Sequence, residues 1–66
     1  MSSSRRSVLI VDDSALVRTV LRDVIDGMAE FEVIGTASDG GQALEAIRAL
    51  APDIVTLDVE MPLLDG

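Results

Sequence analysis

The 66-residue sequence contains no cysteine, histidine, lysine, tryptophan or tyrosine, and Phe31 is its single aromatic residue. Without cysteine and histidine, neither a disulfide framework nor a Cys/His zinc site can support the fold. The absence of cysteine also suits a reducing compartment, so we expect a cytoplasmic protein. Hydrophobic residues make up 48% of the chain, which is more than a disordered segment carries. The sequence therefore predicts one small domain with an aliphatic core.

Basic residues are also scarce, because five arginines stand against twelve acidic residues and the net charge is −7. This balance argues against a nucleic-acid partner. The apolar run Val8-Leu9-Ile10-Val11 stops at Asp12. It is shorter than the roughly 7–15 residues of a signal-peptide core and the ~20 of a membrane span. We expect no membrane insertion, and we interpret residues 1–7 as a disordered N-terminal tail.

Two apolar runs are typical of buried parallel strands, and each runs into acidic residues. Residues 8–11 lead into Asp12 and Asp13, and residues 54–57 lead into Asp58. Because Pro52 ends whatever precedes it, we expect residues 53–62 to contain a buried strand around which the chain is arranged.

Apolar residues at intervals of three and four predict a helix that Ser14 caps and that Gly27 closes in the left-handed conformation. In this helix Leu16, Val17, Val20, Leu21, Val24 and Ile25 form the apolar side, and Arg18, Arg22, Asp23 and Asp26 the other.

Residues 31–37 predict an edge strand and residues 39–41 a turn. A second helix is expected from about Gln42 to Leu50. Its inward residues would be Ala43, Leu44, Ile47 and Leu50, with Glu45 and Arg48 outward.

The alternation of strands and helices predicts an α/β fold, the N-terminal βαβαβ half of a flavodoxin-like doubly wound parallel sheet. With strand order 2-1-3, the carboxyl ends of the first and third strands lie side by side. Asp12, Asp13 and Asp58 would then converge, and three converging carboxylates repel one another unless a cation lies among them. Mg²⁺ or Mn²⁺ suits such oxygen ligands, and beside it Asp58 could act as a nucleophile toward phosphorus.

Each acidic residue also has a purely structural interpretation. Asp12 and Asp13 could serve only to begin a helix, and Asp58 could open a turn. Glu60 could be a solvated loop residue. The functional interpretation rests on two acid-terminated strands at the spacing of one βαβαβ unit.

The sequence resembles the receiver domain of two-component response regulators. The resemblance is carried by residues 8–14, by Asp39-Gly40 before a helix, by Pro52-Asp53, and by Asp58 followed by Met61-Pro62 and Asp65-Gly66. It implies that residues 8–66 are the N-terminal half of a receiver. Asp58 would be the phosphoacceptor, Asp12 and Asp13 the acidic pair at the metal, and the backbone carbonyl of Glu60 a further metal ligand. A sensor histidine kinase, or a small acyl or phosphoramidate donor, would supply the phosphoryl group.

Within that family, residues 12–18 and 56–62 resemble most closely the chemotaxis protein-glutamate methylesterase, in which the receiver regulates a C-terminal catalytic domain. Receivers continue through two further strands and three helices, which carry a Ser/Thr and a Lys that contact the phosphoryl group. Because the sequence stops at Gly66, we expect neither the phosphorylation-driven switch nor esterase activity from this chain alone. The unpaired edge of its third strand would favour self-association.

Two other functions stay open. The chain could be a non-catalytic structural or interaction fragment with a weak acidic cation site. It could also resemble metal-dependent phosphohydrolases of the aspartyl-phosphate type. In those enzymes the nucleophile commonly lies two residues before a second aspartate, a spacing that Asp12-Asp13 lacks.

Overall fold

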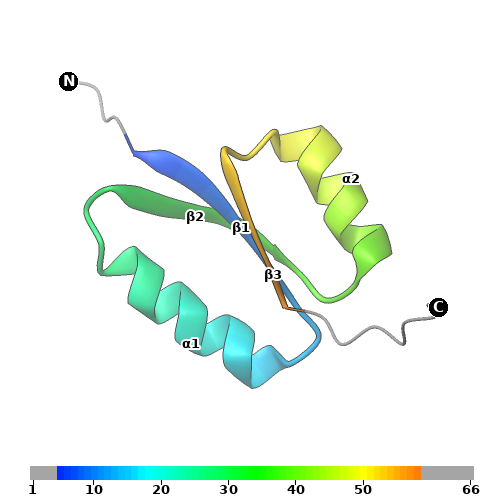
Figure 1. Ribbon diagram of the computed structural model, residues 1–66, viewed down its shortest axis with the longest axis horizontal. Coiled ribbons are helices and arrows are strands. Elements are labelled where there is room, and N and C mark those ends of the chain that lie inside the picture. Colours follow the sequence, from blue (N-terminus) through cyan, green and yellow to red (C-terminus); the bar gives the residue numbers. More distant parts are fainter. Residues whose placement is uncertain (1–4, 59–66) are drawn as a thin grey trace, which may run out of the picture.

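The computed structural model describes residues 5–58, and for Asp58 it describes the backbone alone. The elements are β1 (Arg6–Asp12), α1 (Ala15–Asp26), β2 (Phe31–Ala37), α2 (Gly40–Leu50) and β3 (Ile54–Asp58). The three strands are parallel and lie in the order β2-β1-β3, with α1 and α2 on opposite sides of the sheet (Figure 1). The predicted βαβαβ fold and strand order 2-1-3 are confirmed. None of the helices in this part of the chain has the length and apolar character needed to cross a membrane.

β1, and not β3, is the strand around which the structure is arranged. Residues 8–12 of β1 are all buried, because β1 lies between the other two strands and under both helices. Leu9 and Val11 join Ala37 and Ala43 in the hydrophobic core. The expectation that the strand in residues 53–62 is buried is wrong for the described part, since Leu57 is 65% exposed. Within residues 5–58 the third strand has an unpaired edge, as predicted. Residues 59–62 lie outside the described residues.

β1 begins at Arg6, so Arg6 and Ser7 belong to the strand and not to the expected tail. The backbone N–H of Arg6 donates to the carbonyl of Glu30 at 2.9 Å. The backbone N–H and hydroxyl of Ser7 both donate to Oδ2 of Asp53, at 2.9 and 3.1 Å. These contacts extend the sheet toward the N-terminus; residues 1–4 of the expected tail lie outside the described residues.

Both helices begin at the side chain of a polar residue, as their first turns require partners for free backbone N–H groups. Oγ of Ser14 accepts from the N–H of Val17 at 3.2 Å, which confirms the predicted cap of α1. Oδ1 of Asp39 accepts from the N–H of Gln42 at 2.8 Å. This second cap places Gly40 and Gly41 in the first turn of α2, so the turn predicted over residues 39–41 is wrong.

The ends of the helices also differ from expectation. Gly27 has a φ of −77° and is right-handed, so its predicted left-handed conformation is wrong. The left-handed residue is Ala51, at the end of α2, with a φ of 48°.

Fewer residues of α2 pack against the core than the sequence pattern predicted. Ala43 is buried and Ala46 packs against the core, whereas Leu44 is 57% exposed. Small residues let α2 lie close to the sheet. Gly35 contributes from β2, because a Cβ there would lie 3.0 Å from Cδ1 of Leu50.

Candidate functional site

The candidate site lies where β1 and β3 end side by side. Asp12 and Asp58 are backbone partners in the parallel pairing of these strands. Asp13 follows Asp12 in a bend before α1 and is exposed. The structure thus brings the backbones of the two acid-terminated strands together, as predicted. The side chain of Asp58 and the whole of Glu60 lie outside the described residues.

Asp12 is the described carboxylate with the most unusual surroundings. It is 2% exposed, and its Oδ1 accepts from the backbone N–H of Ser14 at 2.9 Å. Its Oδ2 is buried and has no hydrogen-bond partner among the described residues. Buried polar atoms nearly always have a partner, so an unpaired carboxylate oxygen points to a missing ligand.

The backbone around Asp12 is held from α1. Nη1 of Arg18 donates to the carbonyl oxygen of Asp12 at 2.7 Å, and Arg18 is half-buried. The sequence pattern predicted that Arg18 lies on the side of the helix away from the apolar residues, and it did not predict this contact with Asp12. Helical periodicity separates polar from apolar residues, but it does not show that a long side chain can bend back to a strand end.

A divalent cation fits the donor set at this edge of the sheet. A hard cation prefers carboxylate oxygens, and Oδ2 of Asp12 is a free, desolvated one. Among the residues whose side chains are described, no group of three carboxylate, histidine or cysteine ligands gathers at one point. That search covers neither the Asp58 side chain nor Glu60, which supply half of the predicted ligand set.

At the opposite end of the β1–β3 pair, another carboxylate, that of Asp53, accepts hydrogen bonds from Ser7. Besides the two hydrogen bonds that Asp53 accepts from Ser7, its N–H lies 3.0 Å from the Ser7 carbonyl and 2.9 Å from Oγ. The pKa of the Asp53 carboxyl is lowered from its usual value of 3.8. The largest cause is the hydrogen bond from the Ser7 backbone, followed by the hydrogen bond from the Ser7 hydroxyl, and the positive charge of Arg6 adds to the effect. Desolvation acts in the other direction. This contact joins the start of β1 to the residue that precedes β3.

Comparison with known proteins gives a consistent result. The family model for the response regulator receiver domain matches residues 8–66. A protein-glutamate methylesterase/protein-glutamine glutaminase of Geobacter metallireducens is 54% identical over 66 residues, covering 100% of this chain. Its counterpart in Hydrogenovibrio crunogenus is 56% identical over 63 residues, covering 96% of this chain.

Two solved structures share the fold. The response regulator domain of Thermotoga maritima CheB has a TM-score of 0.83 and 48% identity, over 94% of this chain and 46% of that one. A chain in the structure of the P1 domain of CheA3 in complex with CheY6 from R. sphaeroides has a TM-score of 0.78 and 36% identity. That match covers 98% of this chain and 50% of the other.

These similarities cover only part of each relative. The chain spans 18% of the Geobacter protein, 17% of the Hydrogenovibrio protein and about half of each solved chain. They therefore bear on the domain to which these residues correspond, and not on the catalytic activity named for the whole relatives.

Proposed function

The chain belongs to the response regulator receiver domain family, and from that premise we propose that Asp58 accepts a phosphoryl group in two-component chemotaxis signalling. The observation that carries the proposal is the backbone pairing of Asp12 with Asp58 at the ends of β1 and β3. In open α/β sheets, ligands bind at the carboxyl ends of strands where the winding direction reverses. A strand order of β2-β1-β3 puts that reversal between these two aspartates.

Mg²⁺ or Mn²⁺ would be held by Asp12, Asp13 and Asp58, with the backbone carbonyl of Glu60. The unpaired, buried Oδ2 of Asp12 supports this assignment, because a cation would satisfy it. When bound, the cation offsets the negative charge of both the aspartate and the phosphoryl oxygens.

The chain's own residues position the acidic edge for that chemistry. The N–H of Ser14 donates to Oδ1 of Asp12, which leaves Oδ2 available to a ligand. The guanidinium of Arg18 holds the Asp12 carbonyl, which fixes the backbone at the end of β1. In the transfer, a carboxylate oxygen of Asp58 forms a bond to phosphorus while the bond between phosphorus and the donor breaks. The donor is the phosphohistidine of a sensor kinase, or a small acyl phosphate or phosphoramidate.

The output assigned to this receiver is control of an attached methylesterase domain in the cytoplasm. The support is the identity of 48–57% with curated proteins that carry the methylesterase name. The lack of cysteine agrees with a reducing compartment.

Incubation with a small acyl phosphate and Mg²⁺, followed by intact-mass spectrometry, tests the proposal. We expect the mass of one phosphoryl group to be added to the chain, and to be lost in Asp58→Asn and after chelation of the metal. Asp23→Asn, which removes an exposed carboxylate on α1, is the matched control and should be modified as the parent is. Modification that persists in Asp58→Asn would refute the assignment of the phosphoacceptor.

The alternative is a non-catalytic fragment with a weak cation site. The same unpaired oxygen of Asp12 favours it, because a cation can bind there without any transfer. Thermal stabilisation by Mg²⁺ that Asp13→Asn abolishes, without uptake of phosphate by the parent, would support this alternative over phosphoryl transfer.

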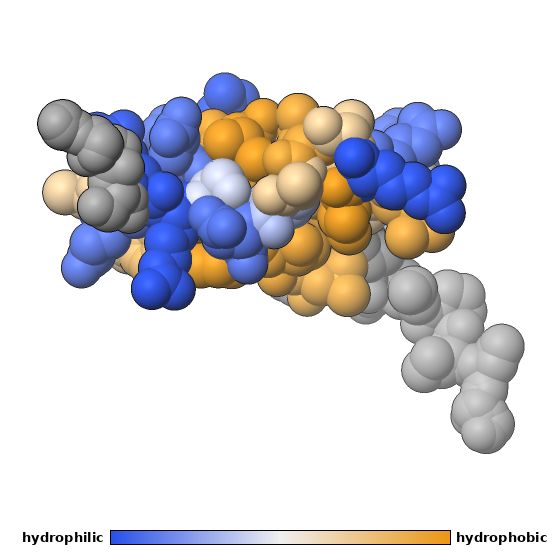
Figure 2. All heavy atoms as spheres, turned by 90° about the horizontal axis from the view of Figure 1, so that it is seen from above, coloured by the Kyte–Doolittle hydropathy of each residue, from blue (hydrophilic) through white to orange (hydrophobic). Residues whose placement is uncertain are grey.

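We also propose that the chain self-associates. Within residues 5–58, β3 has a hydrogen-bonded neighbour on one side only, and Val55 and Leu57 on it are exposed. Exposed strand edges of this kind pair with other chains. Figure 2 shows hydrophobic residues gathered over the middle of one face, between hydrophilic ends. Sedimentation velocity should show a concentration-dependent dimer that Leu57→Lys weakens, and a monomer at all concentrations would contradict the proposal.

A further inference from the structure

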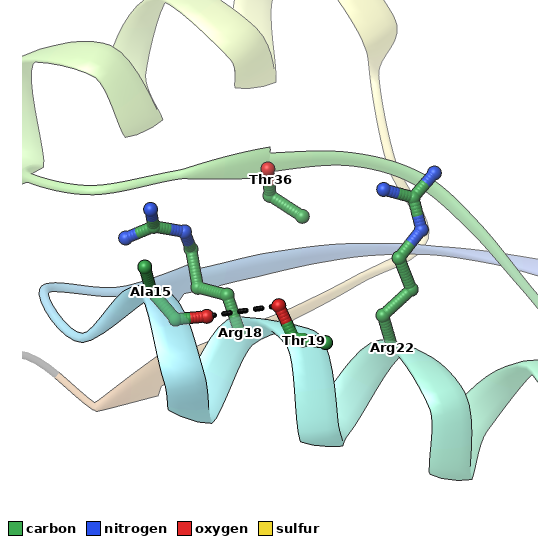
Figure 3. Close-up of a pocket in the computed structure, with 5 residues that line it drawn as sticks. All are labelled: Ala15, Arg18, Thr19, Arg22 and Thr36. Carbon is green, nitrogen blue, oxygen red and sulfur yellow. Dashed lines mark hydrogen bonds between the residues drawn. The ribbon is translucent and has the colours of Figure 1, made fainter.

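A polar pocket lies between α1 and β2. Its volume is about 130 Å³, and its lining residues are Ala15, Arg18, Thr19, Arg22 and Thr36. In Figure 3 the side chains of Arg18 and Arg22 rise from α1 toward β2, and the two threonines lie between them. Two positive groups and two hydroxyls thus face one small space.

The pocket concentrates positive charge in a strongly acidic chain. Arg18 and Arg22 are four residues apart on one side of α1, where like charges repel. Among the described residues, no carboxylate forms an ion pair with either guanidinium, although the chain carries twelve acidic residues. The repulsion between them is therefore not compensated by any carboxylate whose side chain is described.

The donors in the pocket are partly positioned and largely unused. Arg18 is held by one hydrogen bond to the Asp12 carbonyl, which leaves four of the five N–H groups of a guanidinium. Arg22 and the hydroxyl of Thr36 have no hydrogen-bond partner in the part of the chain described. The hydroxyl of Thr19 donates to the Ala15 carbonyl at 3.0 Å, so it is not a free donor.

We infer that this pocket binds a tetrahedral oxyanion of the phosphate or sulfate type between Arg18, Arg22 and Thr36. Guanidinium groups match such oxyanions with paired N–H donors, and a hydroxyl adds a further one. The anion removes the repulsion between the two arginines. Its contact with Arg18 links the pocket to the backbone of Asp12, yet binding requires neither a metal nor Asp58.

The test is a phosphate titration at constant ionic strength with a chelator present, followed by amide NMR. Inorganic phosphate should shift the resonances of residues 15–22 and 36 in a saturable way, and sulfate should do the same. Acetate, a planar monoanion, should bind at least about tenfold more weakly than phosphate. A response to acetate equal to that of phosphate would overturn the assigned ligand class.

Arg22→Gln and Thr36→Val are the informative variants, because both side chains are exposed and neither supports the core. Arg22→Gln should weaken phosphate binding by about tenfold or more, the loss expected for a charge-assisted contact, and Thr36→Val by less. Arg48→Gln removes the same charge from α2 and is the matched control. If Arg48→Gln weakens binding as much as Arg22→Gln, the effect is general electrostatics and the pocket is not a site. Because the chelator excludes the metal, this outcome is independent of phosphoryl transfer to Asp58.

Discussion

Substituting Asp12 by asparagine should stabilise the metal-free chain. Oδ2 of Asp12 is buried and has no partner in the part of the chain that the structure describes. An unsatisfied buried acceptor costs about 1–3 kcal/mol, or more when it is charged. Asparagine keeps the shape of the side chain and the oxygen that accepts from Ser14. It replaces a buried charged group by a neutral one, so we expect a gain of roughly 1–2 kcal/mol in the free energy of unfolding.

The same substitution should remove stabilisation by Mg²⁺. A ligand that binds only the folded state stabilises it by about 2.7 kcal/mol at a hundred times its dissociation constant. The parent should therefore gain this energy in saturating Mg²⁺, and Asp12→Asn should gain little. Asp12→Asn should therefore be the more stable protein in chelator, and the parent the more stable one in saturating Mg²⁺.

Urea denaturation, once with chelator and once with Mg²⁺, measures both effects. The comparison is valid if the free energy of unfolding falls with urea concentration at the same slope in each protein. Asp13→Asn is the control for the metal-free measurement, because Asp13 is exposed and its loss should change stability by no more than about 0.5 kcal/mol. A loss of stability in metal-free Asp12→Asn would refute the argument from the unpaired oxygen. An unchanged response to Mg²⁺ would refute Asp12 as a ligand.

Three further substitutions test local features. Thr56→Val should raise the free energy of unfolding by about 1 kcal/mol in thermal melts, because the buried Thr56 hydroxyl has no hydrogen-bond partner within residues 5–58. A loss of stability would show that it has one. Asp53→Asn should make the free energy of unfolding depend less on pH in acid. Hydrogen bonds from Ser7 lower the pKa of Asp53, so the stabilisation by its carboxylate is present above pH 3.8 and is lost as the pH falls below that value. An unchanged acid profile in urea titrations would contradict this. Ala51→Gly should stabilise by about 0.5–1 kcal/mol because Ala51 has a φ of 48°, whereas Ala49→Gly inside α2 should destabilise by a similar amount; equal effects would exclude strain at Ala51.

The order of the elements and the topology of the sheet could be predicted from the sequence because they depend on local patterns. Two apolar runs that end in aspartate and two helices with three- and four-residue spacing leave few arrangements for parallel strands. The start of α1 at Ser14 was also predictable, since a side-chain cap involves only neighbouring residues.

The degree to which a strand is buried could not be predicted from its own residues. Residues 8–11 and 54–57 have similar apolar character, yet β1 is buried and β3 lies at an edge. Burial depends on which elements pack on both sides of a strand, and that is a property of the whole fold. The left-handed residue at Ala51, in place of Gly27, has the same kind of cause: the path from α2 into β3 requires it.

The features that stabilise this fold also create its candidate functional site. β1 is central because β2 and β3 pair with it on either side, and the burial that stabilises it continues through Asp12. The chain therefore carries a carboxylate where water cannot satisfy both oxygens. Whatever binds Oδ2 relieves that cost and stabilises the central strand at the same time. Because the backbone of Asp12 pairs with that of Asp58, a ligand bound to Asp12 would stabilise the pair of strands that ends in these two residues. Under the proposed function, occupancy of the acidic edge would therefore raise the stability of the sheet.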